Sequence, residues 1–232
     1  MRSSFRLSRT FLPVASVNVI NHKQIPSQII NAYSSTAILP AENKGIFGKL
    51  MGKFANSKSR LRSSSALLYE NVADKINYDA FFREFGMPDT FNSWFLVTEL
   101  HCWLILTRVM NEGPETGQDG RFLRNCVVEA MWADVQVRAK KLSMDNPSAA
   151  RKQVAVLAEQ FQAMLINYDE GLMSDDKILA SALWRRFFEM KCEDYSKLEK
   201  LVSYVRQTSL QLDGMTREEL LRPHIDWLKI SE

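Results

Sequence analysis

The sequence has little of the glycine and proline that break regular structure, with nine glycines and seven prolines among 232 residues. This composition leaves little material for a turn-rich β sandwich. No alternating strand pattern, low-complexity tract or internal repeat is present. Apolar residues make up 46% of the chain, which is enough for a sizeable core. The sequence therefore predicts an all-α fold.

The motifs of common metal and catalytic sites are missing. Cys102, Cys126 and Cys192 contain no CxxC pair, and no histidine has a helical partner at i+4, so a His/Cys zinc site is not supported. We interpret the cysteines as reduced core thiols in a reducing compartment. A nucleophile elbow, a phosphate-binding glycine loop and an HExxH motif are also absent. We predict no enzymatic activity and no catalytic, metal-binding or cofactor-binding residues.

Acidic residues are nearly absent from the first quarter of the chain. Residues 1–62 hold ten Lys/Arg and one acid, a net charge of +9, whereas residues 63–232 have a net charge of −6. A nucleic-acid-binding domain would show a basic face on its folded part. An acidic body behind a basic arm does not fit that class, and we expect no DNA partner.

Residues 1–33 have the composition of a mitochondrial targeting peptide. Arg2, Arg6 and Arg9 alternate with apolar residues, so a short helix here would be basic and amphipathic. A disordered basic tail is the alternative interpretation. The segment around Tyr33 resembles a matrix-processing site, and we predict cleavage after this residue.

Residues 34–65 form a second basic region, which we interpret as a linker or a membrane-surface segment. In a helix its apolar and basic side chains would lie on different faces, and such a segment can lie among the headgroups of an anionic membrane. Three glycines weaken this helix, and a flexible linker explains the composition equally well. The candidate membrane-surface residues are Phe47, Lys49, Leu50, Lys53 and Phe54.

Residues 66–232 are predicted to form one bundle-like domain of about seven helices. Its centre is a helix that starts at Pro88, runs to about Asn111 and is apolar nearly all round, so it must be buried in protein or lie in lipid. Polar residues such as Glu99 and His101 interrupt the run, and a simple membrane span is not expected. The expected helices cover 66–85 (two helices meeting near Asn77), 88–111, 121–142, 147–168, 174–190 and 194–212, with Gly86 and Gly171 as stops and a capping box at Thr216.

An acidic cluster of Asp169, Glu170, Asp175 and Asp176 is the first candidate for chemistry. Carboxylates on adjacent helices can hold Mg²⁺ or divide acid and base roles. However, Asp175 and Asp176 fall in the first turn of a helix, where the macrodipole is a sufficient reason for them. The alternative function that this cluster would support is a Mg-dependent helical enzyme acting on a prenyl or quinone-type substrate.

Glu99 and the tryptophans are the remaining candidates. A buried carboxylate needs a partner, and we expect Glu99 to form a core ion pair with an arginine such as Arg185 or Arg186. The tryptophans at helical spacing are core residues or the rim of a groove, whereas Trp227 in the tail is the better candidate for an exposed anchor. The candidate contacts to a partner or client are Trp94, Glu99, Trp103, Asp175, Asp176, Trp184 and Trp227.

Four strings in the same order, MPDTFNSWFLVTELHCWL, MWADVQVRAKKL, NYDEGLMSDDKILASALWRRFF and KCEDYSKLEKLVSYVRQ, carry a family resemblance. Over about residues 67–213 the chain resembles the ubiquinol–cytochrome c reductase assembly chaperone family. The resemblance implies an assembly factor for mitochondrial respiratory complex III that binds newly made cytochrome b and supports its synthesis and early assembly.

The resemblance also implies partners and a location. They are a small assembly-factor subunit, the mitochondrial ribosome and a peripheral contact with the inner membrane, on its matrix side. The family has no established catalytic residues. A chaperone for apolar helices would offer a Met- and aromatic-rich groove, and the chain has ten methionines.

Overall fold

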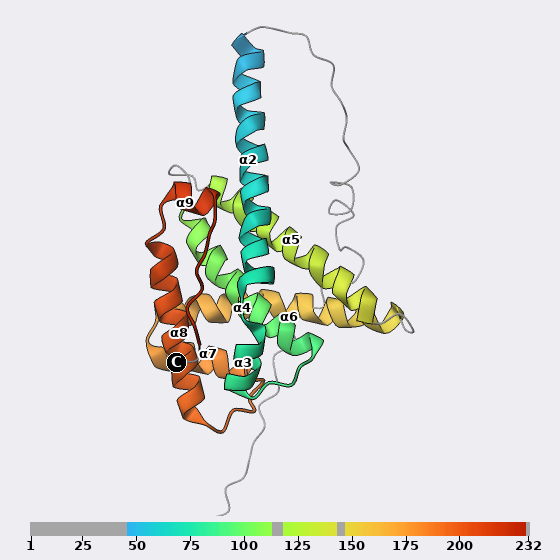
Figure 1. Cartoon of the computed structure of the whole chain (residues 1–232), viewed down its shortest axis with the longest axis vertical. Helices are drawn as coiled ribbons and strands as arrows, with labels where there is room; N and C mark the ends of the chain where they lie inside the picture. Colours follow the sequence, from blue (N-terminus) through green and yellow to red (C-terminus); the bar gives the residue numbers. More distant parts are fainter. Residues whose placement is uncertain (1–45, 113–117, 143–146, 231–232) are drawn as a thin grey trace, which may run out of the picture. The chain divides into compact units, whose positions relative to one another are not determined.

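A computed structural model of the chain describes residues 46–112, 118–142 and 147–230. Within these ranges the protein is all-α, as the sequence predicts, and contains no strand (Figure 1). The described helices are α2 (Ile46–Lys75), α3 (Tyr78–Phe85), α4 (Phe91–Met110), α5 (Gln118–Leu142), α6 (Pro147–Met173), α7 (Asp176–Arg186), α8 (Tyr195–Asp213) and α9 (Arg217–Leu221). None of the helices in these ranges offers the apolar length that a membrane crossing requires.

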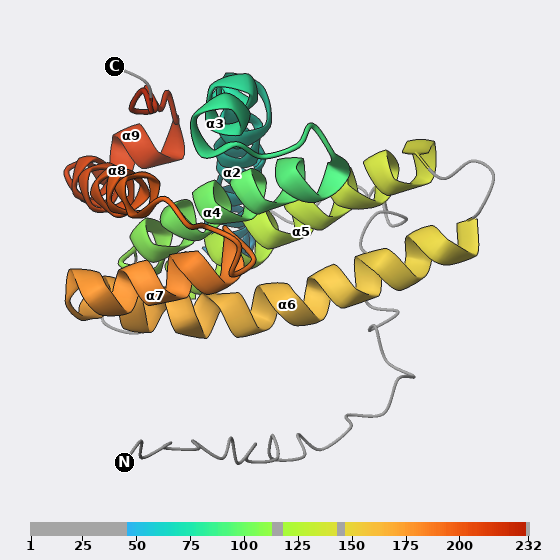
Figure 2. The same cartoon turned by 90° about the horizontal axis from the view of Figure 1, so that it is seen from below.

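The apolar helix α4 is central, as predicted. It contacts α2, α3, α5, α6 and α8, and Figure 2 shows it between α3 on one side and α5 and α6 on the other. Phe95, Leu100 and Trp103 are fully buried. Each such side chain contributes about 1.5–3 kcal/mol by leaving water, so this helix anchors the core.

The local signals around α3 are confirmed, but the start of α4 is not. Asn77 caps α3, and Gly86 ends it in the left-handed conformation with φ of 66°. The expected start of the next helix at Pro88 is wrong, because Thr90 is the N-cap and accepts a hydrogen bond from the Ser93 backbone N–H at 3.3 Å. Pro88 therefore lies in the turn between the two helices.

Gly171 does not end α6, contrary to the prediction. The helix continues to Met173, and a Cβ atom at Gly171 would lie 2.8 Å from the Leu179 Cα. The glycine thus permits the close approach of α6 and α7. The next helix also differs from its prediction, since Asp175 is its N-cap and it ends at Arg186 instead of running to residue 190.

Helix α2 passes through the boundary expected between residues 65 and 66. Leu61 is already buried, and the Ser64 hydroxyl donates to the Leu221 carbonyl at 2.6 Å. The helical domain therefore begins before residue 66. Residues 47–54, which hold the candidate membrane-surface side chains, belong to the backbone of α2, but their side chains lie outside the described part, so that role stays a prediction. The predicted targeting peptide, residues 1–33, also lies outside the described residues.

The chain after α9 packs back onto the helices. The capping box at Thr216 is present as predicted, with Glu219 as its partner. Beyond it, the buried Asn71 accepts a hydrogen bond from the Ile225 N–H at 3.1 Å and donates one to the Pro223 carbonyl at 3.2 Å. Ile225 and Ile230 are buried, so this extended segment is part of the core.

Candidate interaction groove

A cleft of about 540 Å³ lies between the α3–α4 turn and the segment that joins α7 to α8. One wall is residues 85–96, including Met87 and Pro88, and the other is residues 187–197. The left-handed turn at Gly86 lies close to α8. A Cβ atom placed on this glycine would be 3.6 Å from the Lys197 Nζ. The cleft is therefore built where segments distant in sequence meet.

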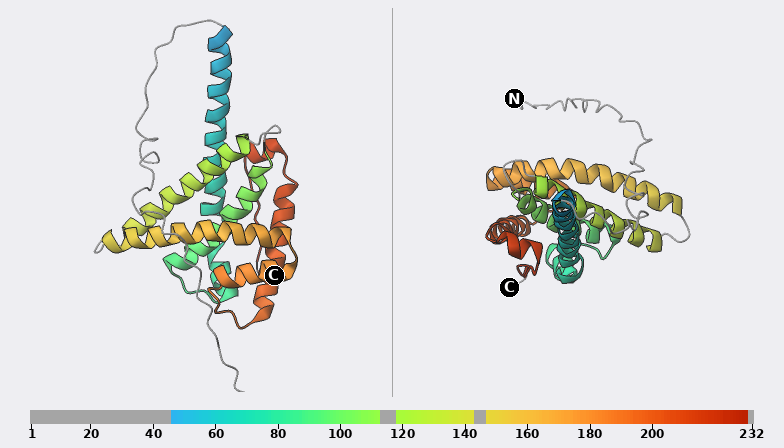
Figure 3. Two further views of the ribbon diagram at one scale, coloured as in Figure 1. Left: turned by 180° about the vertical axis from the view of Figure 1, so that it is seen from behind. Right: turned by 90° about the horizontal axis from the view of Figure 1, so that it is seen from above.

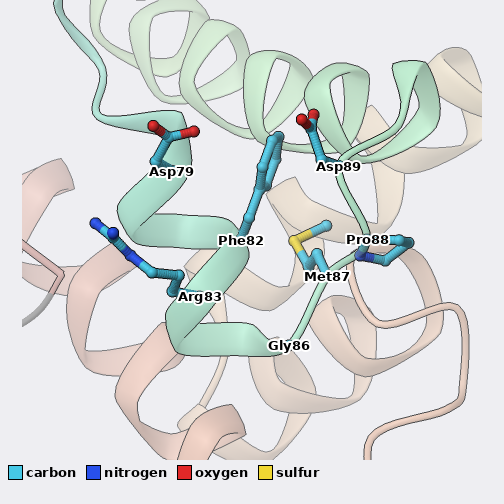
Figure 4. A pocket seen from close by; sticks show the side chains of 7 residues that line it. All are labelled: Asp79, Phe82, Arg83, Gly86, Met87, Pro88 and Asp89. Atoms are coloured by element: carbon cyan, nitrogen blue, oxygen red, sulfur yellow. The ribbon is translucent and has the colours of Figure 1, made fainter.

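A second, shallower hollow lies on the same turn and shares Gly86, Met87 and Pro88 with the cleft. Figure 4 shows the Phe82 side chain rising from α3 with Met87 beside it, while Arg83 points away. Phe82 and Met87 are half-buried, whereas Arg83 is exposed. We call the two hollows together the α3–α4 groove; Phe85, Leu96 and Phe187 are its buried apolar lining.

The second wall contains backbone in an unusual conformation. Glu189 and Met190 have φ of 49° and 61°, which costs a non-glycine residue about 1–2 kcal/mol. The conformation is held by bonds from the Met190 N–H to the Trp184 carbonyl and from the Asn92 side chain to Glu189, at 2.9 and 3.2 Å. Such strain clusters at functional segments.

Sequence reasoning missed this groove. The sequence pattern predicts a helix through residue 190 and another that starts at Pro88, so it places most of both walls in regular structure. A positive φ at Glu189 or Met190 has no signal in the sequence, because neither residue type favours it. The Gly86 stop was the one local clue to a sharp turn here.

Glu99 forms the predicted core ion pair, and its partner is Arg186. The carboxylate is fully buried and accepts from the Arg186 Nε and Nη2 at 2.5 and 2.8 Å. Burial raises the pKa of Glu99 to about 7, although the hydrogen bonds and charge of Arg186 oppose this shift. A fully buried carboxylate cannot touch another protein, so its prediction as a partner contact is wrong.

His101 faces the opposite way from Glu99, as two residues two apart on a helix must. Its Nδ1 lies 2.7 Å from the Val97 carbonyl, so this nitrogen donates, and its Nε2 accepts from the Tyr204 hydroxyl at 2.7 Å. Burial lowers the pKa of His101 to about 4, which keeps the ring neutral. Glu99 and His101 are therefore buried polar side chains whose hydrogen bonds are made within the protein, and their role is structural.

The tryptophans divide into core and partly exposed residues. Trp103 is fully buried and donates from Nε1 to Asp169 at 2.7 Å, so its prediction as a client contact is wrong. Trp227 is not an exposed anchor either, since it is half-buried, packs edge-on against His101 and donates to the Asn71 carbonyl at 2.9 Å. Trp94 and Trp184 are half-buried, and their contact with a partner stays a prediction.

The acidic cluster is dispersed among structural roles. Asp175 caps α7 by accepting from the N–H groups of Lys177 and Ile178, both at 3.0 Å. Asp176 pairs with Arg206 at 3.0 Å. In the described part of the chain no group of three His, Cys, Asp or Glu residues could hold a metal ion. The structure therefore does not gather these carboxylates into the magnesium site that the alternative function requires.

The cysteines agree with the prediction in two cases of three. Cys102 and Cys126 are free and buried, and burial raises the pKa of both thiols. Cys192 is free but only half-buried, because it lines the α3–α4 groove instead of the core.

Comparisons with known proteins agree with one another. The family described as ubiquinol-cytochrome C chaperone matches residues 83–227. The chain is 56% identical over 214 residues to ubiquinol-cytochrome c reductase complex assembly factor 1 of Drosophila melanogaster, covering 86% of this chain and 83% of that protein. It is 39% identical over 201 residues to the protein of the same name from Homo sapiens, covering 83% of this chain and 66% of the human one.

A solved structure shares the fold. The crystal structure of the Cbp3 homolog from Brucella abortus superimposes with a TM-score of 0.59 and covers 80% of this chain and 98% of that one. The two sequences are 22% identical, so this likeness concerns the helical architecture.

Proposed function

This chain belongs to the ubiquinol-cytochrome C chaperone family, and we propose that it is an assembly factor of respiratory complex III that works by binding. The observation that carries the proposal is the match over residues 83–227, which takes in α4 to α8 and both walls of the α3–α4 groove. Its relatives from Drosophila melanogaster and Homo sapiens are named as assembly factors of the ubiquinol-cytochrome c reductase complex.

The client that we propose is newly synthesised cytochrome b, whose synthesis and early assembly the protein supports at the inner membrane. An apolar segment emerging from synthesis needs a surface that shields it from water. The α3–α4 groove offers an apolar lining with the adaptable side chain of Met87 and a rim of both charge signs, including Lys191, Glu193 and Asp194. These features suit an apolar polypeptide segment better than a small charged substrate.

The proposed location is the matrix side of the inner mitochondrial membrane. The basic composition of residues 1–33 supports import, and the basic and apolar side chains of residues 44–62 support a peripheral membrane contact. A small assembly-factor subunit and the mitochondrial ribosome complete the proposed set of partners.

Deletion of the protein tests the function as a whole. We expect cytochrome b and complex III to be depleted, while the other respiratory complexes fall only secondarily. Normal accumulation of cytochrome b in the deleted cells would overturn the proposal.

A groove variant tests the site. Met87→Glu places a charge where an apolar segment would dock, and we expect recovery of newly made cytochrome b with the full-length chain to fall about tenfold. Leu210→Glu is the matched control, because Leu210 is an apolar residue that is 75% exposed on α8 and does not line the groove. Equal recovery with both variants, at equal melting temperatures, contradicts the groove assignment.

A further inference from the structure

The outward face of α6 carries apolar side chains where a surface helix would ordinarily be polar. Val156, Ile166 and Met173 are 51%, 72% and 84% exposed, and Ala163 between them is also exposed. Successive positions 156, 159, 163, 166, 170 and 173 are spaced by three and four residues in alternation, so they line up along one side of the helix. We call the six residues at these positions the α6 stripe.

The residues of the stripe are not part of the hydrophobic core. The inward face of α6 is a separate set of buried side chains, Leu157, Phe161, Met164 and Tyr168. The helix packs mainly against α4, α5 and α7, Arg206 of α8 donates to its Leu172 carbonyl, and Figure 3 shows it lying on the outer side of α4 and α5. The inward residues therefore account for the packing of α6, and the stripe faces away from it.

The charged side chains that the chain itself carries along the stripe are all acidic, and Arg206 of α8 pairs with a further acidic residue, Asp176, beyond its end. Residues 153–176 hold five acidic residues and no Lys or Arg. Glu159 and Glu170 are members of the stripe, are exposed, and form no ion pair with any described residue. Asp169 lies beside Glu170 and accepts a hydrogen bond from the Trp103 indole. The α6 stripe is thus an apolar strip that carries two glutamates without an ion-pair partner among the described residues.

We propose that the α6 stripe docks a basic amphipathic helix of another polypeptide. Alternating spacings of three and four are those of a coiled-coil seam, in which a second helix covers the apolar positions. Glu159 and Glu170 occupy two positions of this seam, where long basic side chains at the edges of the covering helix can reach them. From Val156 to Met173 the stripe is about 26 Å long, which matches a partner helix of about 18 residues. Lys or Arg on that helix would compensate Glu159 and Glu170.

The same charge argues against two other occupants. An anionic bilayer or a nucleic acid would be repelled by a strip without basic residues. The stripe is also separate from the α3–α4 groove, because no residue of α6 lines that groove. The proposal therefore goes beyond the client site and does not depend on which client the groove takes.

A pair of synthetic helices tests the chemistry of the partner. The first probe is a fluorescein-labelled 18-residue peptide with leucine at the a and d positions and lysine at e and g, and its twin carries glutamate at e and g. We expect the purified full chain to bind the lysine peptide about tenfold more tightly than the glutamate peptide by fluorescence anisotropy, and this preference to shrink in high salt. Failure of the lysine peptide to bind, or equal affinity for both peptides, overturns the proposal.

Variants then locate the binding. Ile166→Ser and Met173→Ser should each weaken the lysine peptide about tenfold, since each removes an apolar contact. The matched control Leu210→Ser removes an equally exposed apolar side chain on α8 and should leave the affinity unchanged. The double variant Glu159→Lys with Glu170→Lys should reverse the preference between the two peptides. If Leu210→Ser weakens binding as much as Ile166→Ser, the binding is not at the stripe.

Cross-linking in cells identifies the natural occupant. A photoreactive amino acid replaces Ile166 in one full-length variant and Leu210 in another, and the linked peptides are sequenced. A Lys- or Arg-flanked apolar helix of another polypeptide linked at position 166 and not at 210 is the expected result. Links at 166 to residues 1–45 of this chain, to a second copy or to phospholipid overturn the proposal, as does no specific link. The same probe at position 87 reports on the client groove, so either surface can fail alone.

Discussion

Carboxylates lie in two contrasting regions of this molecule, the interior of α4 and the outer side of α6 with its turn into α7. Glu99 in the interior is fully buried and held by two hydrogen bonds from Arg186, whereas Glu170 and Asp175 are exposed. A charge taken out of water costs several kcal/mol unless it is paired, while a charge left in water costs almost nothing. The buried carboxylate therefore stabilises the fold, whereas the exposed carboxylates can cap a helix or contact a partner.

The buried pair should show the largest effect. Arg186→Met leaves Glu99 buried without its partner, and we expect the free energy of unfolding to fall by about 3–5 kcal/mol in urea titrations. The double variant Glu99→Leu with Arg186→Met is the control, since apolar replacements of similar volume should recover much of that loss. A loss below about 1 kcal/mol in the single variant would remove the distinction between the two regions.

The second buried group of α4 should appear in the pH dependence of stability. The pKa of His101 is lowered to about 4, so its contribution is complete above pH 6.5 and is lost as the pH falls toward 4. Glu99 has its pKa raised to about 7, so its contribution is present below pH 4.5 and is lost as the pH rises through 7. The two groups oppose each other in the wild type between these limits.

His101→Gln should separate the two contributions. Relative to the wild type, the variant should gain roughly 3 kcal/mol of stability between pH 6.5 and 4, because it carries no group that must stay neutral. Chemical denaturation at a series of pH values measures this difference, and groups common to both proteins cancel. Parallel stability curves would mean that His101 is not held neutral.

The close contact between α6 and α7 at Gly171 should have an intermediate effect on stability. Gly171→Ala places a methyl group 2.8 Å from the Leu179 Cα, where only backbone movement can relieve the contact. We expect a loss of about 1–3 kcal/mol, measured by thermal unfolding. Gly214→Ala is the matched control, because the nearest atom to its Cβ position is 3.4 Å away and its φ is negative. Similar losses in both variants would contradict the close approach of α6 and α7.

The exposed carboxylates should give the smallest effects. Asp175→Ala removes the N-cap of α7 and should cost about 1 kcal/mol. Asp176→Ala removes a surface ion pair with Arg206 and one acidic charge from the first turn of α7, and it should cost less than Asp175→Ala, under about 1 kcal/mol. Differential scanning calorimetry resolves the two. If Asp176→Ala lowers the stability more than Asp175→Ala does, Asp176 has a role beyond the first turn of α7 and its ion pair.

Helix ends could be predicted where a single residue supplies the signal. Gly86 and Thr216 act as expected, and the two helices meet at Asn77 as predicted, because an acceptor side chain or a permissive backbone works within three residues of itself. Gly171 was misread as a stop because the same residue type also serves close packing, and that use depends on Leu179 of another helix. The sequence alone does not show whether a glycine ends a helix or permits close packing between two helices.

The candidate site was less accessible to prediction. Buried and partly exposed apolar residues have the same composition, so the sequence does not distinguish the fully buried Trp103 from the half-buried Trp94. The α3–α4 groove joins Met87 to Phe188, a hundred residues later, through a turn with positive φ at Glu189 and Met190. The neighbouring residues in the sequence contain no signal for this turn.

The sequence by itself determined that the protein is helical, that α4 is its centre and that Glu99 needs an arginine, because periodicity and the cost of a buried charge act on each residue directly. Only the tertiary structure decided that the arginine is Arg186, that Trp227 packs against the core and that α6 turns an apolar, acidic stripe outward. These outcomes depend on which helix packs against which, and that choice is made by the summed burial of many side chains.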